Sequence, residues 1–373
     1  MKTQAAILRK PGSSWEIAEL ELDPPRDGEV LVRFMAAGLC HSDEHIRAGD
    51  APIRLPLVGG HEGAGVVEAV GPGVTRVAPG DHIVCSFVPV CGTCEYCSTG
   101  RQGLCEHATN VAVGCMNDGT FRWHAGGEDY GGMCQVGSFA QRAVVLEWSV
   151  IKIDPSVPFE LAALVGCGVP TGWGSAVRAA GVQAGDTVVI FGTGGVGINA
   201  VQGARHAGAK HVVAVDPVEF KRQKALELGA THAVADAKAA KELLTELNGI
   251  KLADKAIITV GALTGEVIRQ AVESIGKGGL VMITSVGKFA DMNMDMSPGP
   301  LIGAQRTIKG ALMGAVNPLY DVPRLLGLYQ TGDLKLSELI TQRYSLDQIN
   351  DGFRDLMDGK NIRGVLIHEH EGN

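Results

Sequence analysis

Short apolar stretches that alternate with polar residues mark the first 150 residues as predominantly β-structure. Residues 29–34 and 65–70 show this alternation, and turn-forming residues separate such stretches, as in the Gly-Pro-Gly sequence at 71–73. No long helical period is visible in this region. The spacing of the runs predicts a small all-β barrel or sandwich.

From about residue 159 the pattern changes to strands and helices in alternation. Strands are predicted over 187–191, 211–215, 255–260 and 280–284. Helices are predicted over 159–164, 198–207 and 266–275. Alternation at this spacing predicts βαβ units around a parallel sheet that is buried on both faces. The alternation fades after residue 312, so a helix near 322–329 and a closing strand over 364–368 belong to a different part of the fold.

Composition favours a two-domain protein that binds metal. The chain has 373 residues, roughly twice the length of a typical domain. Its 33 basic and 41 acidic residues give a formal charge of −8, which argues against nucleic acid or an anionic membrane surface as the main partner. No apolar run suits a membrane span or a signal peptide, so we expect a cytoplasmic protein. Nine cysteines in a reducing compartment favour metal binding over disulfides.

Four closely spaced cysteines carry the strongest chemical signal. The segment CGTCEYCSTGRQGLC holds Cys91, Cys94, Cys97 and Cys105. Four thiolates on a short loop can surround Zn²⁺ tetrahedrally without an open ligand position, which is typical of a structural site. An iron–sulfur cluster and four unrelated cysteines are the alternatives, but the long gap before Cys105 and the Glu106 after it differ from the bacterial cluster motif. We therefore predict a structural zinc.

A glycine-rich loop follows the apolar strand over 187–191. It consists of Gly192, Thr193, Gly194, Gly195, Val196 and Gly197, and the next predicted strand ends just before Asp216. Such glycines allow a tight turn and a close approach of the backbone to a pyrophosphate at the following helix N-terminus. Asp216 would accept hydrogen bonds from the adenosine ribose and repel a 2′-phosphate, so the loop predicts NAD rather than NADP. A purely structural glycine turn is the alternative.

A candidate catalytic metal site is dispersed along the chain. His61 and Glu62 follow a pair of glycines without phosphate-loop spacing, and Cys40 and Cys167 lie outside the four-cysteine segment. One imidazole and two thiolates, with water in the fourth position, form a known ligand set of catalytic zinc. Spacing alone does not bring these residues together, and an isolated histidine is more often a satisfied structural residue.

Six motifs resemble, in this order, the zinc-dependent medium-chain alcohol dehydrogenases: GLCHSD, GHEGAGVVEAVGPGV, PGDHIV, CGTCEYCSTGRQGLC, GCGVPTGWGSAV and GTGGVG. The resemblance extends from about Lys2 to His368. PVEFKR, NPLYDVPRLL and NIRGV further resemble the actinobacterial subgroup that depends on N,N-dimethyl-4-nitrosoaniline, whose members are nicotinoproteins that hold NAD tightly and recycle it in place. The resemblance implies a Rossmann doubly wound parallel sheet (169–312) inserted in a GroES-like β-barrel catalytic domain (1–168 and 313–373).

For catalysis, the resemblance implies a second zinc ion per chain, bound by Cys40, His61 and Cys167. Glu62 would be a transient ligand, and Asp43 would orient His61. The alcohol would be deprotonated at this zinc and would pass hydride to nicotinamide, giving the aldehyde, and the reverse reaction would use the same groups.

The resemblance also implies a proton relay and a cofactor site. Ser42 corresponds to the residue that hydrogen-bonds the substrate oxygen, a nicotinamide-ribose hydroxyl follows, and His45 ends the relay. Phe87 matches an aromatic wall of the substrate pocket. The residues implied for NAD(H) are His41 and Arg363 near the pyrophosphate, Asp216 and Lys221 near the adenosine ribose, and Thr171, Gly192, Gly194, Gly195, Val196, Gly197 and Val260.

Three other functions remain open at this level. An alcohol dehydrogenase with exchanging NAD and a thiol-dependent formaldehyde dehydrogenase would carry similar motifs. Thr109 stands where the glutathione-dependent branch carries an arginine, which disfavours glutathione adducts and leaves mycothiol adducts open. A non-enzymatic NAD-binding protein is disfavoured because the three catalytic zinc ligands are present. We expect a small-molecule alcohol or aldehyde, an external electron acceptor and a second copy of the chain as partners, and neither nucleic acid nor membrane.

Overall fold

The computed structural model describes residues 1–288, 294 and 296–370, which form two compact units. The first unit comprises Met1–Cys167 and Asn317–Asn373, and the second comprises Gly168–Val316. The second break lies after residue 316 rather than after the predicted 312, because the turn Leu312–Ala315 packs on a helix of the second unit. Among the described residues, no helix combines the length and apolar character that a bilayer crossing requires.

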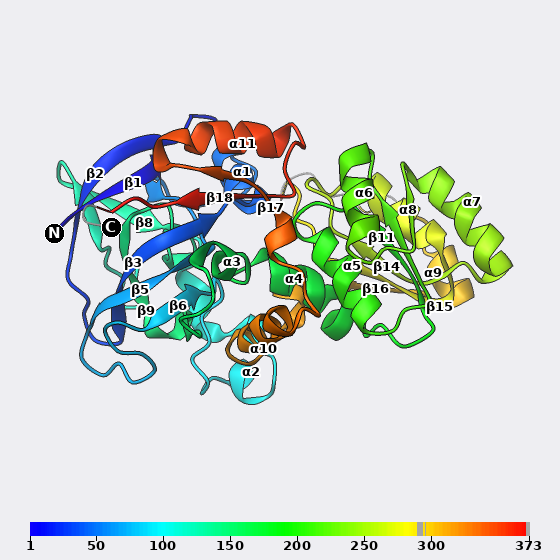
Figure 1. Cartoon of the computed structure of the whole chain (residues 1–373), viewed down its shortest axis with the longest axis horizontal. Helices are drawn as coiled ribbons and strands as arrows, with labels where there is room; N and C mark the ends of the chain where they lie inside the picture. The colour runs from blue at the N-terminus through cyan, green and yellow to red at the C-terminus, as the bar shows by residue number, and fades with distance from the viewer. Residues whose placement is uncertain (289–293, 295, 371–373) are drawn as a thin grey trace. The chain divides into compact units, whose positions relative to one another are not determined.

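The first unit is built from a closed barrel and a seven-stranded sheet (Figure 1). The barrel strands, in spatial order, are β1 (Lys2–Leu8), β2 (Glu16–Leu22), β7 (Trp123–Ala125), β8 (Glu128–Gly132) and β4 (Leu57–Val58). The sheet runs in the order β10 (Val150–Lys152), β6 (His82–Cys85), β5 (Gly63–Val70), β3 (Glu29–Gly38), β18 (Arg363–Ile367) and β17 (Ile340–Tyr344), and β9 (Arg142–Leu146) pairs with β3. The fold class that the barrel pattern predicts is confirmed.

Strand β18 explains why the end of the chain breaks the alternation of strands and helices. It pairs antiparallel with β3, so that Val365 lies opposite Gly38 and Leu366 opposite Ala37. The last strand of the chain therefore completes a sheet that begins more than three hundred residues earlier. This pairing is what returns the C-terminal segment to the first unit.

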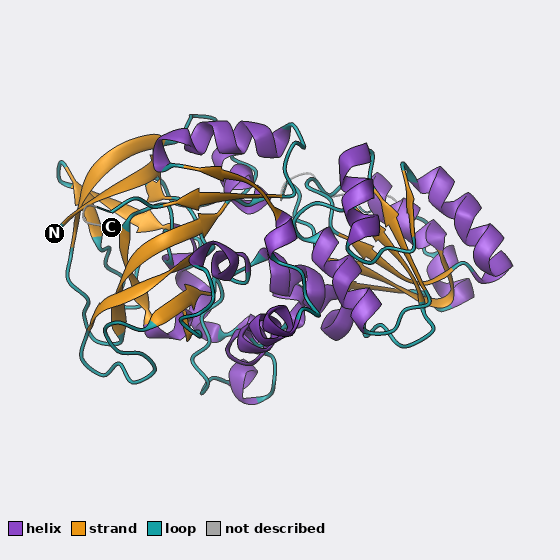
Figure 2. Ribbon diagram, viewed as in Figure 1, coloured by secondary structure: helices purple, strands orange, loops and turns teal. Residues whose placement is uncertain are grey.

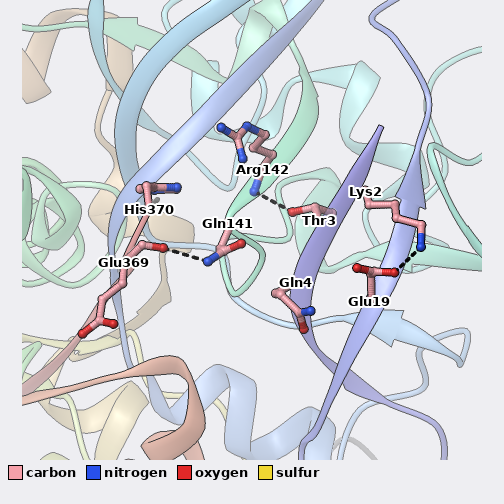
Figure 3. Close-up of a pocket in the computed structure, with 8 residues that line it drawn as sticks. All are labelled: Lys2, Thr3, Gln4, Glu19, Gln141, Arg142, Glu369 and His370. Atoms are coloured by element: carbon pink, nitrogen blue, oxygen red, sulfur yellow. Dashed lines mark hydrogen bonds and ion pairs between the residues drawn. The ribbon is translucent and has the colours of Figure 1, made fainter. Parts of the chain in front are cut away.

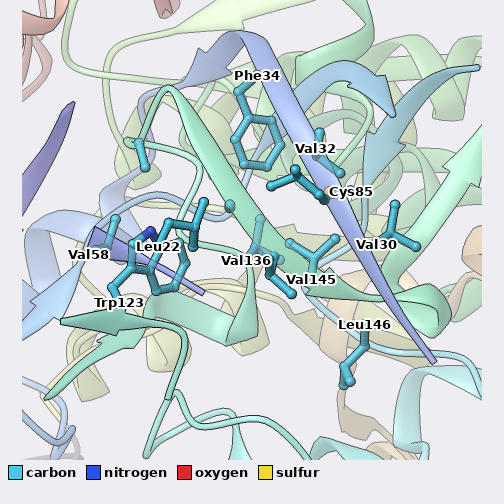
Figure 4. Packing of buried hydrophobic residues seen from close by; sticks show 14 of the residues in the cluster. Leu22, Val30, Val32, Phe34, Val58, Cys85, Trp123, Val136, Val145 and Leu146 are labelled. Carbon is cyan, nitrogen blue, oxygen red and sulfur yellow. The ribbon is translucent and has the colours of Figure 1, made fainter. Parts of the chain in front are cut away.

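Alternate residues of the sheet strands form the core of the first unit (Figure 4). Val30, Val32 and Phe34 of β3 are fully buried in one hydrophobic cluster that also includes Val145 of β9 and Trp123 of β7. Their spacing of two residues places these β3 side chains on one face of the strand, as the alternating pattern requires.

Helices also occur in the region that the sequence pattern predicts as all-β, so that prediction is wrong in this respect. The helices of the first unit are α1 (His41–Ala48), α2 (Glu95–Ser98), α3 (Phe159–Leu164), α10 (Pro318–Thr331) and α11 (Ile349–Met357). Helix α1 has no apolar stripe because its buried positions are Asp43, Glu44 and Ile46. Two of its three buried side chains are acidic, and a hydrophobic period therefore cannot reveal it.

The second unit is a six-stranded parallel sheet with helices on both faces (Figure 2). Its strand order is β13 (His232–Val234), β12 (His211–Val215), β11 (Thr187–Phe191), β14 (Ala253–Ile258), β15 (Ile275–Ile283) and β16 (Thr307–Gly310). Its helices are α4 (Gly168–Gly174), α5 (Gly197–His206), α6 (Glu219–Glu227), α7 (Ala237–Asn248), α8 (Gly265–Ser274) and α9 (Gly299–Ala304). This is the doubly wound arrangement, with β11 and β14 at the point where the strand order reverses.

The apolar residues of these strands divide between the two faces. Val189 and Phe191 of β11 pack with Leu244 of α7 and with Ile268 and Val272 of α8. Because the strands are buried on both faces, their sequences are continuously apolar rather than alternating. Strands β11 and β12 have the predicted bounds, whereas β14 ends two residues before the predicted strand, at residue 258 instead of 260.

Candidate active site and metal centres

The four cysteines of the CGTCEYCSTGRQGLC segment converge on one point. Their sulfur atoms all lie within 4.8 Å of one another. The Sγ atoms of Cys91 and Cys97 are 3.9 Å apart, and those of Cys94 and Cys105 are 4.0 Å apart. Sulfur ligands of a tetrahedral zinc are separated by about 3.8 Å, given Zn–S bonds of about 2.3 Å. The arrangement therefore fits a four-coordinate zinc with no open position.

Local backbone geometry explains this convergence. Gly92 has a φ of 86°, which turns the chain tightly between the first two cysteines. Cys94 precedes helix α2, and its sulfur accepts a hydrogen bond from the Cys97 amide. Arg76 donates to the carbonyl oxygens of Val90 at 2.9 Å and Cys91 at 3.2 Å, which ties the start of the segment to the neighbouring loop.

The backbone also favours ionised sulfur in this cluster. Burial raises the pKa of the Cys91 thiol, but the amide groups of Cys94 and Thr93 donate to its sulfur and lower the pKa to about 6. Burial raises the pKa of Cys97 to about 12. At least one sulfur is therefore ready to bind a cation, because the thiolate is the ligand form.

A second cluster unites the dispersed candidates for a catalytic metal. One ligand atom each from Cys40, His61, Glu62 and Cys167 lies within 4.8 Å of the other three, and all four residues are buried. The pairing of β3 with β5 accounts for two of these segments, because Ala37 lies opposite Gly63. Cys40 follows β3, and His61 and Glu62 immediately precede β5. The structure thus brings together every residue of the predicted set.

Asp43 fixes the orientation of His61. It is fully buried, and its Oδ1 lies 3.4 Å from Nδ1 of His61 and accepts the Gly60 amide at 3.1 Å. Its Oδ2 accepts the Cys40 amide at 3.3 Å. The other imidazole nitrogen, Nε2, is buried and has no hydrogen-bond partner among the described residues. A buried nitrogen in this state needs a partner, and a metal ion in the cluster would supply one.

The electrostatics of this cluster favour a cation. Burial alone would lower the pKa of His61, but Asp43 and Cys40 outweigh it and hold the pKa well above its usual value. The pKa of Cys40 is lowered well below its usual value, chiefly by a hydrogen bond from Cys167 and further by His61. The surroundings therefore favour positive charge at this position and negative charge at one sulfur. Because the ligand form of histidine is the neutral ring, a Zn²⁺ ion would replace the imidazolium proton and supply the positive charge itself.

Glu62 forms a buried ion pair with Arg363. The guanidinium Nη2 contacts the Glu62 carboxylate, and both side chains are almost completely inaccessible. Burial raises the pKa of Glu62 to about 7, even though Arg363 acts to lower it. Gly38 makes room for the pair, because a Cβ at this position would lie 2.0 Å from a Glu62 oxygen. The family resemblance implies that Arg363 lies near the pyrophosphate, and its contact with Glu62 was not predicted.

Helix α1 carries most of the other predicted catalytic residues. Ser42 lies beside the metal cluster, with its Oγ 3.7 Å from Cys40 Sγ. His45, one turn later, contacts Asp50 at 2.9 Å. His41 is the first residue of the helix. Phe87 reaches the cluster from another segment, and its ring meets the His61 ring edge-on with centroids 5.7 Å apart.

The glycine loop of the second unit has the features of a nucleotide loop. Gly192 has a φ of 85°, and a Cβ there would lie 2.9 Å from the Val260 backbone. A Cβ on Gly197 would lie 1.8 Å from the Gly192 carbonyl oxygen, so this glycine allows α5 to approach β11. Gly194 faces open space. Gly195 and Val196 lie between them at the start of α5, so the loop exposes backbone beside a helix N-terminus.

Asp216 follows β12 and closes this loop. Its Oδ2 accepts the Thr193 amide at 2.8 Å, and its Oδ1 accepts the Val218 amide at 2.9 Å. Lys221 lies nearby in sequence on α6, and Val260 follows β14. Thr171 on α4 is buried, and its hydroxyl oxygen has no hydrogen-bond partner in the described part of the chain.

A polar pocket beside the two chain ends is distinct from these sites (Figure 3). Its lining residues are Lys2, Thr3, Gln4, Glu19, Gln141, Arg142, Glu369 and His370. Lys2 pairs with Glu19 at 2.5 Å, and Gln141 donates to the Glu369 carbonyl at 2.7 Å. The Arg142 guanidinium pairs with Glu68 at 2.8 Å, and His370 Nε2 contacts the Phe34 carbonyl oxygen at 2.7 Å. These polar groups of the pocket therefore already have partners within the protein.

Two family models match the chain in the order of its two units. The model described as "Alcohol dehydrogenase GroES-like domain" matches residues 26–155, and the model described as "Zinc-binding dehydrogenase" matches residues 195–330. The chain is also 57% identical over 368 residues to the NDMA-dependent alcohol dehydrogenase of Amycolatopsis methanolica, and the match covers 99% of each protein. The chain belongs to the zinc-dependent medium-chain alcohol dehydrogenases.

The chain is also similar to a solved structure and to a relative with a different name. A crystal structure of an alcohol dehydrogenase zinc-binding domain protein from Burkholderia ambifaria superposes with a TM-score of 0.92 at 34% identity, covering 99% of this chain and 100% of that chain. The S-(hydroxymethyl)glutathione dehydrogenase of Escherichia coli is 37% identical over 373 residues, covering 98% of this chain and 100% of that protein. As a member of this family, the present chain is an enzyme that uses zinc and a nicotinamide cofactor to interconvert alcohols and aldehydes.

Proposed function

We propose that this alcohol dehydrogenase is a nicotinoprotein. Its NAD(H) stays bound between turnovers, and an external electron acceptor reoxidises it in place. The observation that carries this proposal is the 57% identity, over 99% of both chains, to a relative whose name states dependence on NDMA. We further propose two zinc ions per chain, one in each four-residue cluster, and a homo-oligomeric enzyme.

The four-cysteine cluster would hold the structural zinc, and Cys40, His61 and Cys167 would hold the catalytic one. When bound at the second site, zinc acts as a Lewis acid on the alcohol oxygen and lowers its pKa. Asp43 keeps Nδ1 of His61 turned towards itself, so that Nε2 faces the other ligand atoms. Glu62, held by Arg363, supplies a carboxylate oxygen within the same cluster and can act as a transient ligand.

Ser42 and His45 would carry the substrate proton. The Ser42 hydroxyl lies next to a ligand sulfur, where a substrate hydroxyl would approach. Residues three apart on a helix share a face, so His45 lies on the same side of α1 as Ser42. Ser42 would accept the proton from the alcohol, and His45 would release it to solvent. Phe87 would form an apolar wall beside the reacting carbon.

The second unit would bind NAD(H), whose oxidised form, NAD⁺, would supply the hydride acceptor for alcohol oxidation. Gly192 and Gly194 would let the backbone approach the pyrophosphate, and Gly197 lets α5 pack close to β11. Gly195 and Val196 lead into this helix, whose N-terminus would stabilise the pyrophosphate charge. Asp216 and Lys221 would select the adenosine ribose of NAD. Thr171, Val260, His41 and Arg363 complete the proposed cofactor set.

Acceptor-dependent turnover tests the proposed function. Desalted enzyme should oxidise alcohols with N,N-dimethyl-4-nitrosoaniline as the sole added oxidant, and added NAD should not raise the rate. A Cys167→Ser variant, which lacks one catalytic ligand, should be inactive with either oxidant. An enzyme that is silent with the nitrosoaniline but turns over with added NAD would be an exchanging alcohol dehydrogenase instead.

A further inference from the structure

A carboxylate outside the metal and nucleotide sites lies against the histidine at the end of α1. Asp50 Oδ2 lies 2.9 Å from Nδ1 of His45. Only 12% of the His45 side chain and 17% of the Asp50 side chain are exposed, so the contact is largely shielded from water. A polar contact of this length and burial holds its members in place more firmly than a surface ion pair.

The end of helix α1 creates this contact. In a continued helix, a residue five positions after His45 would point about 140° away from it around the axis. The helix instead ends at Ala48, and Gly49 adopts the left-handed conformation with a φ of 85°. The chain then folds back, and the Asp50 amide donates to the His45 carbonyl at 2.8 Å. Gly49 therefore brings the Asp50 side chain to the imidazole.

The other charged residues of this helix end are paired elsewhere. Arg47 forms two hydrogen bonds of 2.7 Å with the carboxylate of Glu44 and also donates to the Ser13 carbonyl. Within residues 1–288, 294 and 296–370, the only cationic or titratable nitrogen that pairs with the Asp50 carboxylate is that of His45.

We infer that Asp50 is a positioning residue for His45. A carboxylate can only accept this hydrogen bond, so Nδ1 carries the proton and Nε2 is the nitrogen that takes up and releases protons. Asp50 thereby selects the tautomer and ring orientation in which His45 can act, as a carboxylate does for the histidine of a hydrolase triad. This inference rests on the proposed proton-transfer role of His45.

The alternative explanation is that the contact between Asp50 and His45 is purely structural. The two explanations differ in whether the effects of substituting Asp50 and His45 on the reaction rate are additive. The holoenzyme and its Asp50→Asn, His45→Gln and doubly substituted variants are mixed with alcohol, and the rate of NADH formation in the first turnover is measured. We expect Asp50→Asn to slow this step at least tenfold, because the amide can donate to Nδ1 and stabilise the wrong tautomer. In the His45→Gln background, the same substitution should change the rate less than twofold.

A matched variant controls for stability. Asp236 caps helix α7 by accepting the Ala239 amide at 2.8 Å, so Asp236→Asn also alters an aspartate at a helix end. It should leave the rate unchanged, and zinc and NAD(H) contents should be equal in all variants.

Three outcomes would overturn the inference. An unchanged rate in Asp50→Asn would show that His45 needs no carboxylate. An equal loss in the His45→Gln background would show that Asp50 acts through the fold and not through His45. A normal rate in His45→Gln alone would remove the proton-transfer role itself, and with it the proposed relay, while acceptor-dependent turnover would still stand.

Discussion

The buried pair of Glu62 and Arg363 depends on a position that has no side chain. A Cβ on Gly38 would lie 2.0 Å from a Glu62 carboxylate oxygen and 2.7 Å from Arg363 Nη2. Neither partner can move into solvent, because both are buried. The loss of stability caused by a side chain at position 38 therefore measures how tightly Glu62 and Arg363 are packed.

Gly38→Ala should destabilise the protein by roughly 1–3 kcal/mol, the usual cost of overpacking a buried site. Urea unfolding of the variant and the wild type measures the difference. Gly327→Ala is the matched control, because this glycine lies within α10 and an added Cβ meets nothing within 4 Å. The control should gain up to about 1 kcal/mol from helix propensity. Equal stability of Gly38→Ala and wild type would show that the pair is loosely held.

Ser42→Ala should lower turnover by about 10²–10⁴-fold, the range typical of general acid–base groups. Its zinc and NAD(H) contents should stay normal, since Ser42 is not a ligand. Turnover per bound zinc is the measurement, and Ser14→Ala, which changes an exposed serine, serves as control. Unchanged activity in Ser42→Ala would remove this residue from the relay.

At the level of the residue, the sequence predicts which side chains form the metal site better than it predicts the contacts between distant side chains. Each member of the four-residue cluster with Cys40 and Cys167 was predicted, because thiolates and imidazoles are recognisable ligands and the motifs are specific. The contact of Arg363 with Glu62 was not predicted, since it joins residues 301 positions apart through β-sheet pairing. The contact of Asp50 with His45 has only a local signal in the sequence, Gly49, a residue typical of helix ends.

At the level of the element, burial decided what could be predicted. Strands β11 and β12 are buried on both faces, so their apolar runs coincide with the strands themselves. Strand β13 and helix α6 were not predicted, because β13 has three half-buried residues and α6 buries only Ala225. Helix α1 was not predicted because acidic side chains occupy its buried positions. One of these buried acidic residues, Asp43, has a role in the site because it orients His61.

The four-cysteine segment is an element whose prediction can be tested directly. Cys105→Ser should remove one zinc per chain and lower the thermal unfolding temperature, because structural zinc contributes folding free energy. Metal analysis before and after substitution measures the loss. Cys115→Ala, which changes a buried cysteine outside both clusters, should keep the full zinc content. A full zinc complement in Cys105→Ser would exclude this segment as a zinc site.

At the level of the whole molecule, buried His368 links stability to pH. It lies just after β18, and its Nε2 contacts the Ser138 carbonyl oxygen at 2.9 Å. Burial lowers its pKa from 6.5 to about 4. The folded protein keeps the ring neutral where the unfolded chain takes up a proton, so this contribution is complete above pH 6.5 and is lost as the pH falls to about 4.

Unfolding free energies of wild type and His368→Gln, measured at pH 7 and pH 5, test this link. Glutamine keeps a donor for the Ser138 carbonyl but does not titrate. Wild type should therefore lose about 2 kcal/mol more than the variant between these pH values. His206→Gln, which changes an exposed histidine, should follow wild type. Parallel pH dependence of His368→Gln and wild type would contradict a depressed pKa for His368.

The topology of the whole molecule also explains why the chain contains both a β-rich pattern and an alternation of strands and helices. The parallel sheet of the second unit interrupts the first unit, and β18 returns to pair with β3. The break in periodicity near residue 312 could be predicted, whereas the strand that receives the last segment could not. An alternating pattern can mark each strand, but it does not identify the distant strand with which it pairs.

The measurement that tests the central claim is the content of the purified enzyme after exhaustive desalting. The protein is denatured, and the released NAD(H) and zinc are quantified per chain. A nicotinoprotein with two filled clusters should release close to one NAD(H) and about two zinc ions per chain. Two zinc ions without nucleotide, together with alcohol oxidation that requires added NAD, would contradict resident NAD(H) and identify an exchanging alcohol dehydrogenase.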